Sequence, residues 1–129
     1  MKTNKVTLII ITILLTLTFF HSAHSDNLNQ ETKENLNNLL SEMQRKHLNT
    51  GKFLTTIKKL TQSPPAKEYL EQKLIIILTQ STAAGSGMRA AWLLGEMKSK
   101  KAVPHLIRAK KDNHLWIRKA AELALKKIQ

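Results

Sequence analysis

Apolar side chains recur every three or four residues along most of the chain, a spacing that predicts helices. The first helix in this pattern covers about residues 29–48, and Asn49-Thr50-Gly51 predicts its end, with glycine as the C-terminal cap. A short second helix is predicted over residues 53–60. The apolar stripe on which the first helix would pack comprises Leu36, Leu39, Leu40 and Met43.

A third helix is predicted over residues 65–80. Ser63 is a good N-terminal cap, and Pro65 fits the first turn because the amide hydrogen it lacks is not needed there. The apolar run at residues 74–78 (Leu-Ile-Ile-Ile-Leu) has a strand as its alternative, since β-branched residues favour sheets. We favour the helix because strong helix formers precede the run and the chain offers no second strand to pair with it. A helix that is apolar on all sides is expected to be central and buried.

Ala84-Gly-Ser-Gly87 is interpreted as a flexible joint between an irregular first half and a more regular second half. Its Gly-Ser-Gly sequence lacks the preceding strand and the flanking residues that a nucleophile elbow or a phosphate-binding loop requires. Three further helices are predicted after it, over residues 88–98, 101–110 and 115–128.

The second half repeats itself at a period of 31 residues. Residues 94–97 (Leu-Gly-Glu-Met) recur as 125–128 (Leu-Lys-Lys-Ile), and Ala90 falls on Ala121 in the same frame. Such a period is typical of stacked helical repeats, which present a surface rather than a catalytic pocket. The predicted fold class is therefore all-α, a short α-solenoid of antiparallel helix pairs with about six helices.

Small residues in this half predict that neighbouring helices approach closely, while larger apolar residues fill the layer between helix pairs. The small positions are Ala90, Ala91, Ala120, Ala121 and Ala124, and the larger ones are Leu94, Leu106, Leu123, Leu125 and Ile128.

The C-terminal third of the chain resembles the HEAT-like repeats first associated with phycobilisome lyases. The resemblance rests on Ala-Val-Pro-His-Leu-Ile at residues 102–107 and on the spacing Asp112-x4-Ile-Arg-x-Ala-Ala-x2-Ala-Leu-x2-Ile128. It implies repeats of two antiparallel helices stacked in a right-handed solenoid, and it leaves function open because that family includes scaffolds, enzyme-associated modules and nucleic-acid binders. It further implies that Asp112 and Arg118 support the stacking. The positions expected to maintain the repeats are Ala90, Leu94, Gly95, Pro104, Asp112, Arg118, Ala121 and Leu125.

The resemblance covers about a third of the chain and sets the expected domain organisation. Residues 84–129 are taken as HEAT-like repeats. Residues 26–83, which lack the repeat consensus, are taken as a divergent N-terminal helical unit that caps the stack.

The N-terminus predicts export. Two lysines stand within the first five residues, residues 6–20 carry no charge, and Ala23 and Ser25 give a small-x-small cleavage pattern. Together these features are typical of a secretory signal peptide over residues 1–25. A retained membrane anchor is the alternative, but the apolar run is shorter than the roughly 20 residues that a spanning helix needs. The expected product, residues 26–129, is periplasmic or secreted.

Charge is concentrated in the second half. Of the formal net charge of +12, residues 26–87 contribute +2 and residues 88–129 contribute +8, from eleven basic and three acidic residues. An acidic protein surface, an anionic polymer or an anionic membrane are the partners that such a region attracts, and export makes nucleic acid a poor candidate. The alternative is that the lysines only keep a small helical protein soluble.

No catalytic or metal-binding constellation is evident. The chain has no cysteine, which excludes disulfides, zinc-thiolate sites and cysteine nucleophiles. His47, His105 and His114 show no metal-ligand spacing, and the carboxylates suggest no catalytic pair. We therefore expect a protein that is not an enzyme, with no cofactor, no metal and no small-molecule substrate.

The sequence thus favours an exported, non-catalytic module that binds another protein, as an inhibitor or immunity protein of the periplasm or as a scaffold. The alternative is an electrostatic binder of an anionic polymer or membrane surface, and a terminal repeat could also bury its face against a second copy. Both tryptophans have a further interpretation, in which they pack between repeats. The candidate partner-binding residues are Arg89, Trp92, Arg108, Lys111, Trp116 and Arg118.

Overall fold

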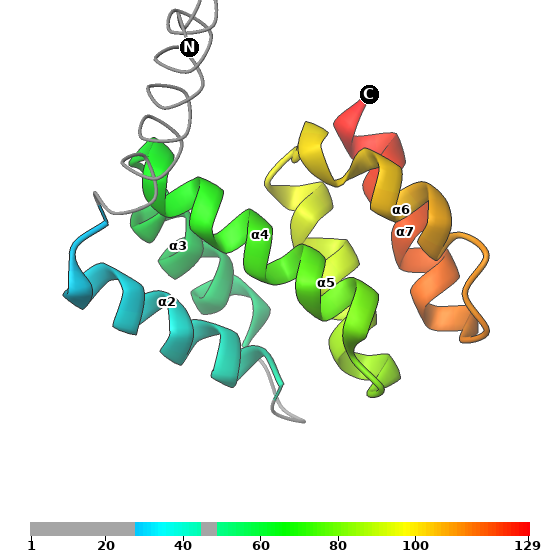
Figure 1. The fold of residues 1–129 in the computed structure, drawn as a ribbon, viewed down its shortest axis with the longest axis horizontal. Helices are drawn as coiled ribbons and strands as arrows, with labels where there is room; N and C mark the ends of the chain where they lie inside the picture. Colours follow the sequence, from blue (N-terminus) through cyan, green and yellow to red (C-terminus); the bar gives the residue numbers. More distant parts are fainter. Residues whose placement is uncertain (1–27, 45–48) are drawn as a thin grey trace, which may run out of the picture.

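The computed structural model describes residues 28–44 and 49–129. Of these residues 81% are helical and none forms a strand, so the all-α fold class is confirmed. The predicted signal peptide lies outside the described residues. Six α-helices pack against one another (Figure 1). They are α2 (Gln30–Met43), α3 (Thr50–Leu60), α4 (Pro64–Gln80), α5 (Ala84–Glu96), α6 (Val103–Ala109) and α7 (Leu115–Ile128), with a 3₁₀ turn, η1 (Lys100–Ala102), before α6.

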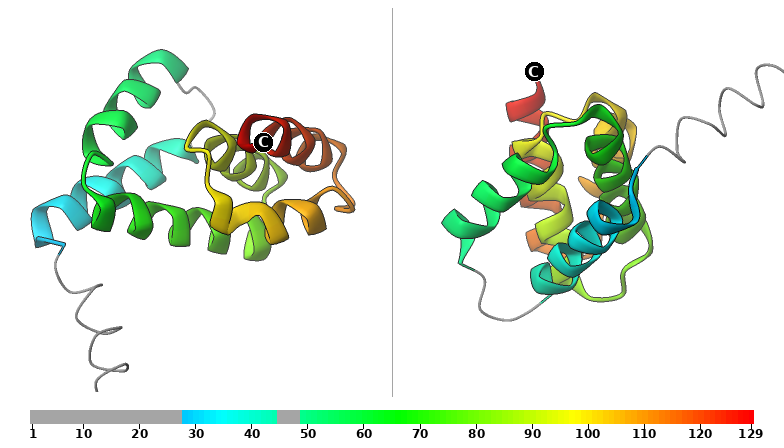
Figure 2. Two further views of the ribbon diagram at one scale, coloured as in Figure 1. Left: turned by 90° about the horizontal axis from the view of Figure 1, so that it is seen from above. Right: turned by 90° about the vertical axis from the view of Figure 1, so that its left-hand side faces the viewer.

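The helices follow one another along the molecule, with α2 and α3 at one end, α4 and α5 in the middle, and α6 and α7 at the other end (Figure 1). Figure 2 shows two layers in the C-terminal part, one containing α4 and α6 and the other α5 and α7. The contact between α5 and α7 is the most extensive of those between the described helices, followed by α4–α5 and α6–α7. Because α4 also contacts α2, it links the two ends of the molecule.

Asparagine side chains begin the first two helices. Asn29 Oδ1 accepts a hydrogen bond from the backbone N–H of Thr32 at 2.8 Å, and Asn49 Oδ1 accepts one from Lys52 at 3.1 Å. The prediction that Asn49-Thr50-Gly51 ends a helix was therefore wrong, because Asn49 caps the start of α3 and Gly51 lies in its first turn. Asparagine is favoured at helix N-caps as well as in turns, so the same residues can indicate either the end of one helix or the start of the next.

Helix α4 begins as predicted. Ser63 caps it by accepting a hydrogen bond from the N–H of Ala66 at 3.4 Å, and prolines occupy its first turn. The apolar run is helical, with Leu74 and Leu78 buried. Ile76 is exposed, so the expectation that this helix is buried on all sides was wrong: neighbouring helices leave one side of α4 open to solvent.

The predicted joint at Ala84–Gly87 is instead the first turn of α5. The N–H of Gly87 donates to the carbonyl of Ala83 at 3.2 Å, and Gly87 is buried. A Cβ built at Gly87 would lie 2.8 Å from Cδ1 of Ile117 on α7. The glycine here makes room for a neighbouring helix, and this packing outweighs the low helix propensity of glycine.

Close packing of α5 on α7 confirms the prediction made from the small residues. A Cβ built at Gly95 would lie 2.6 Å from the Cα of Ala124, so the two helix backbones nearly touch. Ala90, Ala91 and Ala121 are fully buried. Such an approach is possible only where one helix has no side chain and the other has a small one.

The prediction that the larger apolar residues fill the layer between helix pairs is confirmed only in part. Leu94 and Leu106 are fully buried, and Leu125 and Ile128 are half-buried against the core. Leu123 is 59% exposed, so its assignment to the layer between helices was wrong. At about 100° per residue it falls on the side of α7 away from Ala121 and Ala124.

The end of α5 is a Schellman motif. The N–H of Ser99 donates to the carbonyl of Leu94 at 3.0 Å, and the N–H of Lys98 donates to that of Gly95 at 3.0 Å. Lys98 has φ of 50°, a left-handed conformation that glycine usually supplies. The chain then turns into η1 and α6, where Pro104 occupies the first turn.

Candidate functional site

Two of the candidate partner-binding residues take part in internal packing. Arg89 Nη1 donates a hydrogen bond of 2.6 Å to the carbonyl of Met43, which joins α5 to the last residue of α2. Trp92 is half-buried against the core, as the interpretation of tryptophan as a packing residue anticipates. Contacts within the protein therefore account for the positions of both side chains.

Arg118 and Asp112 order the turn before α7. Arg118 Nη1 donates to the carbonyls of Asp112 at 2.8 Å and Asn113 at 3.0 Å. Asp112 Oδ1 accepts a hydrogen bond from the N–H of His114 at 2.8 Å and lies 3.1 Å from His114 Nδ1. The backbone hydrogen bond from His114 is the main reason that the pKa of Asp112 lies below its ordinary value. Both residues thus act within this turn, and Arg118 binds the carbonyl of Asp112 rather than its carboxylate.

The remaining three candidates, Arg108, Lys111 and Trp116, are exposed. Arg108 Nη2 lies 3.2 Å from His105 Nδ1. Trp116 is 63% exposed, and the Nζ of Lys119 lies 5.7 Å from the centre of its ring. That distance is within the range of a cation–π contact.

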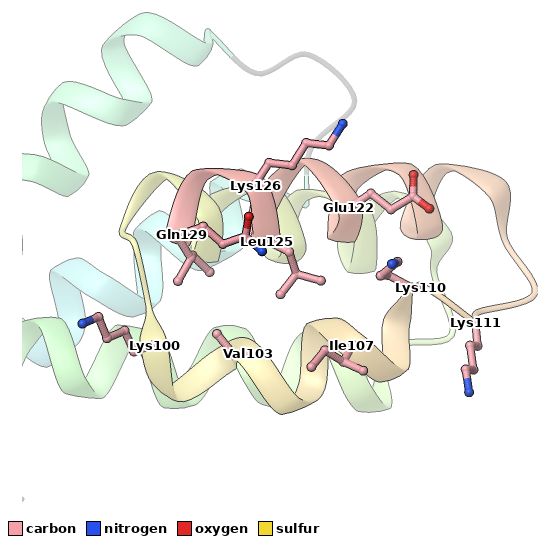
Figure 3. Close-up of a pocket in the computed structure, with 10 residues that line it drawn as sticks. Lys100, Val103, Ile107, Lys110, Lys111, Glu122, Leu125, Lys126 and Gln129 are labelled. Carbon is pink, nitrogen blue, oxygen red and sulfur yellow. The ribbon is translucent and has the colours of Figure 1, made fainter.

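The structure places an open groove between α6 and α7, with a volume of about 990 Å³ (Figure 3). Apolar side chains from both helices meet across it: Val103 and Ile107 from α6, and Leu125 and Ile128 from α7. Ile107 is 52% exposed, a high value for a large aliphatic residue. The remaining lining residues are Lys100, Lys110, Lys111, Glu122, Lys126 and Gln129.

Lysines surround the apolar floor of the groove. Four lysines and one glutamate, Glu122, line it, so its local charge is strongly positive. Figure 3 shows the amino groups of Lys100, Lys111 and Lys126 directed away from the floor, at the edge of the groove. None of the four lysines has an ion-pair partner within residues 28–44 and 49–129.

Two other lysines in this part of the chain, Lys101 and Lys127, form ion pairs. Lys127 of α7 pairs with Glu96 of α5, and Lys101 of η1 pairs with Glu68 of α4. The hydrogen bond from Lys101 to Glu68 is the main cause that raises the pKa of Lys101 above its ordinary value. These two lysines thus reach back to the preceding helices α4 and α5, whereas the four lysines that line the groove form no ion pair among the described residues.

Of the residues that line this groove, the sequence analysis predicted only Lys111 to bind a partner and assigned Leu125 and Ile128 to the layer between helix pairs. The apolar floor residues do show a pattern in the sequence that indicates one apolar face on each helix. Val103 and Ile107 are four residues apart on α6, and Leu125 and Ile128 are three apart on α7. What the sequence lacks is the relative placement of α6 and α7, which brings the two pairs together.

A second groove lies between α2 and α3, with a volume of about 420 Å³. Half of its lining residues are asparagine or threonine, and the others are two leucines, one lysine and one glutamate, so its charge is not of one sign. We therefore take the α6–α7 groove as the candidate functional site.

The described part of the chain contains no group of three or more histidine, aspartate or glutamate side chains that could hold a metal ion. Nor does any helix within it combine the length and apolar character needed to cross a bilayer. In comparisons with known proteins, no protein family, curated protein or solved structure matches this chain.

Proposed function

We propose that this protein is a non-catalytic binding module that recognises another protein through an acidic surface. The observation that carries the proposal is the α6–α7 groove, which combines an apolar floor with four lysines that have no ion-pair partner in the described chain. Protein interfaces typically place an apolar centre inside a polar rim. Unpaired lysines around such a centre would favour an acidic partner and speed its association.

The proposed architecture is a short α-solenoid of HEAT-like helix pairs. Three side-chain contacts between helices support it, because they join residues at nearly constant separation. The separation is 31 residues for Lys127 and Glu96, 33 for Lys101 and Glu68, and 32 for the hydrogen bond from Tyr69 to Asn37. Stacked units of equal length bring equivalent positions together in this way.

We further propose that the protein is exported by its N-terminal segment and acts in the periplasm or outside the cell. There it would serve as an inhibitor or immunity protein that covers an acidic cleft, or as a scaffold. A rigid helical surface suits either role because little conformational entropy is lost on binding.

A second candidate is binding to an anionic polymer or membrane surface, and the outer side of α7 favours it. Trp116 and Leu123 are both strongly exposed there, with Lys119 between them in sequence and against the Trp116 ring. Aromatic and basic side chains on one helix face suit an anionic membrane surface. Binding of this kind weakens steeply as salt rises, whereas a protein interface with an apolar centre persists.

Affinity capture from a cell-envelope extract tests the proposal. Residues 26–129 would be immobilised through the N-terminus, because Gln129 lines the groove and a C-terminal tag would obstruct it. Washes at about 0.15 M and then about 1 M salt separate partners held mainly by charge attraction, which salt screens, from partners held mainly by apolar contact. A single protein retained in equal amount to the bait at high salt supports the proposal. Retention of polyanions or lipid alone, lost as salt rises, contradicts it in favour of the second candidate.

A further inference from the structure

We propose that the α6–α7 groove binds one amphipathic helix of the partner, with its apolar face on the groove floor and acidic residues on its flanks. The inference rests on the proposed function, and specifies both the site and the chemical nature of what it recognises.

The floor has the spacing that accepts a helix. Val103 and Ile107 are one turn apart on α6, and Leu125 and Ile128 are nearly one turn apart on α7. Two such rows on neighbouring helices form the grooves into which the side chains of a third helix pack. The apolar residues of that helix would recur at i, i+3, i+4 and i+7.

The groove lies on the open side of the α6–α7 helix pair. Figure 3 looks onto α6 and α7 with α4 and α5 behind them, so the opposite side of this pair is already covered. Contacts of α4 with α6 and of α5 with α7 show how the preceding helices cover it. A bound helix would cover the exposed side in the same manner.

Charge selects the occupant. A second copy placed groove to groove would oppose its four lysines with four identical ones, which is unfavourable at short distance. The groove at the opposite end of the molecule, between α2 and α3, is lined by one lysine and one glutamate and therefore offers no net acidic counterpart. Aspartates or glutamates beside the apolar face of the occupant would instead lie near Lys100, Lys110, Lys111 and Lys126.

The probe is a peptide of about 15 residues, long enough to cover the groove, and cross-linked to hold it helical because free peptides of this length are marginal helices. It carries leucine at i, i+3, i+4 and i+7 and glutamate on both flanks. A second peptide replaces each glutamate with lysine. We expect the acidic peptide to bind and the basic one to bind at least about tenfold more weakly, measured by fluorescence anisotropy.

Exposed residues provide matched variants that should not disturb folding. Ile107→Gln removes an apolar contact in the groove, and Leu123→Gln makes the same kind of change at an exposed site on the far side of α7. We expect about a tenfold loss of peptide affinity for Ile107→Gln and less than about twofold for Leu123→Gln. Circular dichroism would check that each variant keeps its helical content.

The charge test pairs Lys110→Glu/Lys126→Glu with Lys119→Glu, which changes a lysine beside Trp116 instead. The double variant is expected to lose at least about tenfold in affinity for the acidic peptide and to gain affinity for the basic one. The Lys119→Glu variant is expected to bind both peptides as the unmodified protein does.

Three results would overturn the inference: no binding of the acidic peptide, equal losses in the groove and control variants, or a dimer in light scattering that Ile107→Gln dissociates. Binding to vesicles of anionic lipid that is lost with Ile107→Gln but kept with Leu123→Gln would also overturn it, in favour of a membrane occupant.

A protein captured from the envelope and retained by the Ile107→Gln variant would leave the proposed function intact while excluding this groove. Displacement of that protein by the acidic peptide would support both.

Discussion

The two halves of the molecule are packed with different side chains. Among the described residues before residue 84, Ala66 is the one buried alanine or glycine, and the core is built from leucine, isoleucine, methionine and phenylalanine. From residue 84 onward, small residues dominate the α5–α7 contact, where Gly95 meets Ala124. The buried small residues of the second half are Gly87, Ala90, Ala91, Gly95, Ala102, Ala109, Ala120, Ala121 and Ala124.

This difference indicates that the halves tolerate opposite kinds of change. A core of large side chains loses stability when one of them is shortened, because a cavity remains. A contact between helix backbones loses stability when a side chain is enlarged, because nothing nearby can give way. The second half also carries most of the net charge. The lysine-lined groove therefore lies on the half of the molecule whose helices are most closely packed.

The largest effect is expected from shortening a core residue in the first half. Leu36 is fully buried on α2, and Leu36→Ala should lower the free energy of unfolding by about 3 kcal/mol through lost apolar burial and a residual cavity. Urea denaturation measures this change. Leu123→Ala, at an exposed site, is the control and should cost less than about 0.5 kcal/mol. Equal losses for the two variants would contradict the burial of Leu36.

Enlarging a glycine in the second half should give the next largest effect. Gly95→Ala places a methyl group against the backbone of Ala124 and is expected to cost about 2 kcal/mol. Gly87→Ala meets the end of the Ile117 side chain rather than backbone, and the gain in helix propensity offsets part of the cost, so this variant is expected to lose less stability than Gly95→Ala. Thermal unfolding of the pair measures the difference, and similar melting temperatures would mean that α5 and α7 are not in backbone contact.

A smaller effect of opposite sign is expected at the end of α5. Lys98→Gly removes the cost of a left-handed conformation at a residue with φ of 50° and should raise the free energy of unfolding by about 1 kcal/mol. Lys100→Gly, two residues later in η1, is a control in which glycine offers no such relief. Stabilisation by both variants would point to a charge effect rather than a conformational one.

The smallest effect concerns pH. The pKa of Asp112 is held below its ordinary value of 3.8, chiefly by the hydrogen bond from the His114 N–H. Its contribution to stability is therefore complete above that value and is lost as the pH falls through the lowered pKa. Asp112→Asn should cost less than about 1 kcal/mol near pH 7, and the difference from the unmodified protein should shrink toward about pH 2.

Melting temperatures measured by circular dichroism across this pH range provide the test. Glu122→Gln is the matched control, because that carboxylate is exposed and has no ion-pair partner among the described residues. A constant difference between Asp112→Asn and the unmodified protein at every pH would mean that the charge of Asp112 plays no part.

Much of the fold could be predicted from local patterns. Helix α7 spans the predicted residues, Leu115–Ile128, and α4 begins at the predicted serine and proline signals, because caps and apolar periodicity are local properties. The errors at Asn49 and at Ala84–Gly87 arose where one residue type serves two purposes. Glycine can interrupt a helix, but at Gly87 it makes room for a helix that lies 30 residues later in the chain.

The candidate site was less predictable. Arg89 and Arg118 are basic residues of the kind that suggests a binding surface, but both donate to backbone carbonyls. The groove floor depends on two helices meeting, which no local pattern specifies. Trp116 differs from these two arginines. The sequence left open whether it packs between helices or is exposed, and in the structure it is exposed.

Three of the side-chain contacts between helices join residues 31 to 33 positions apart, and this similar spacing also has a kinetic consequence. Every extensive contact joins α-helices that are neighbours or next-but-one neighbours along the chain, so a helix can dock without waiting for a distant part of the chain. Chains with such local contacts fold within microseconds to milliseconds. We therefore expect refolding to begin wherever two adjacent helices first meet and to spread outward, so that α6 and α7 can assemble without waiting for α2.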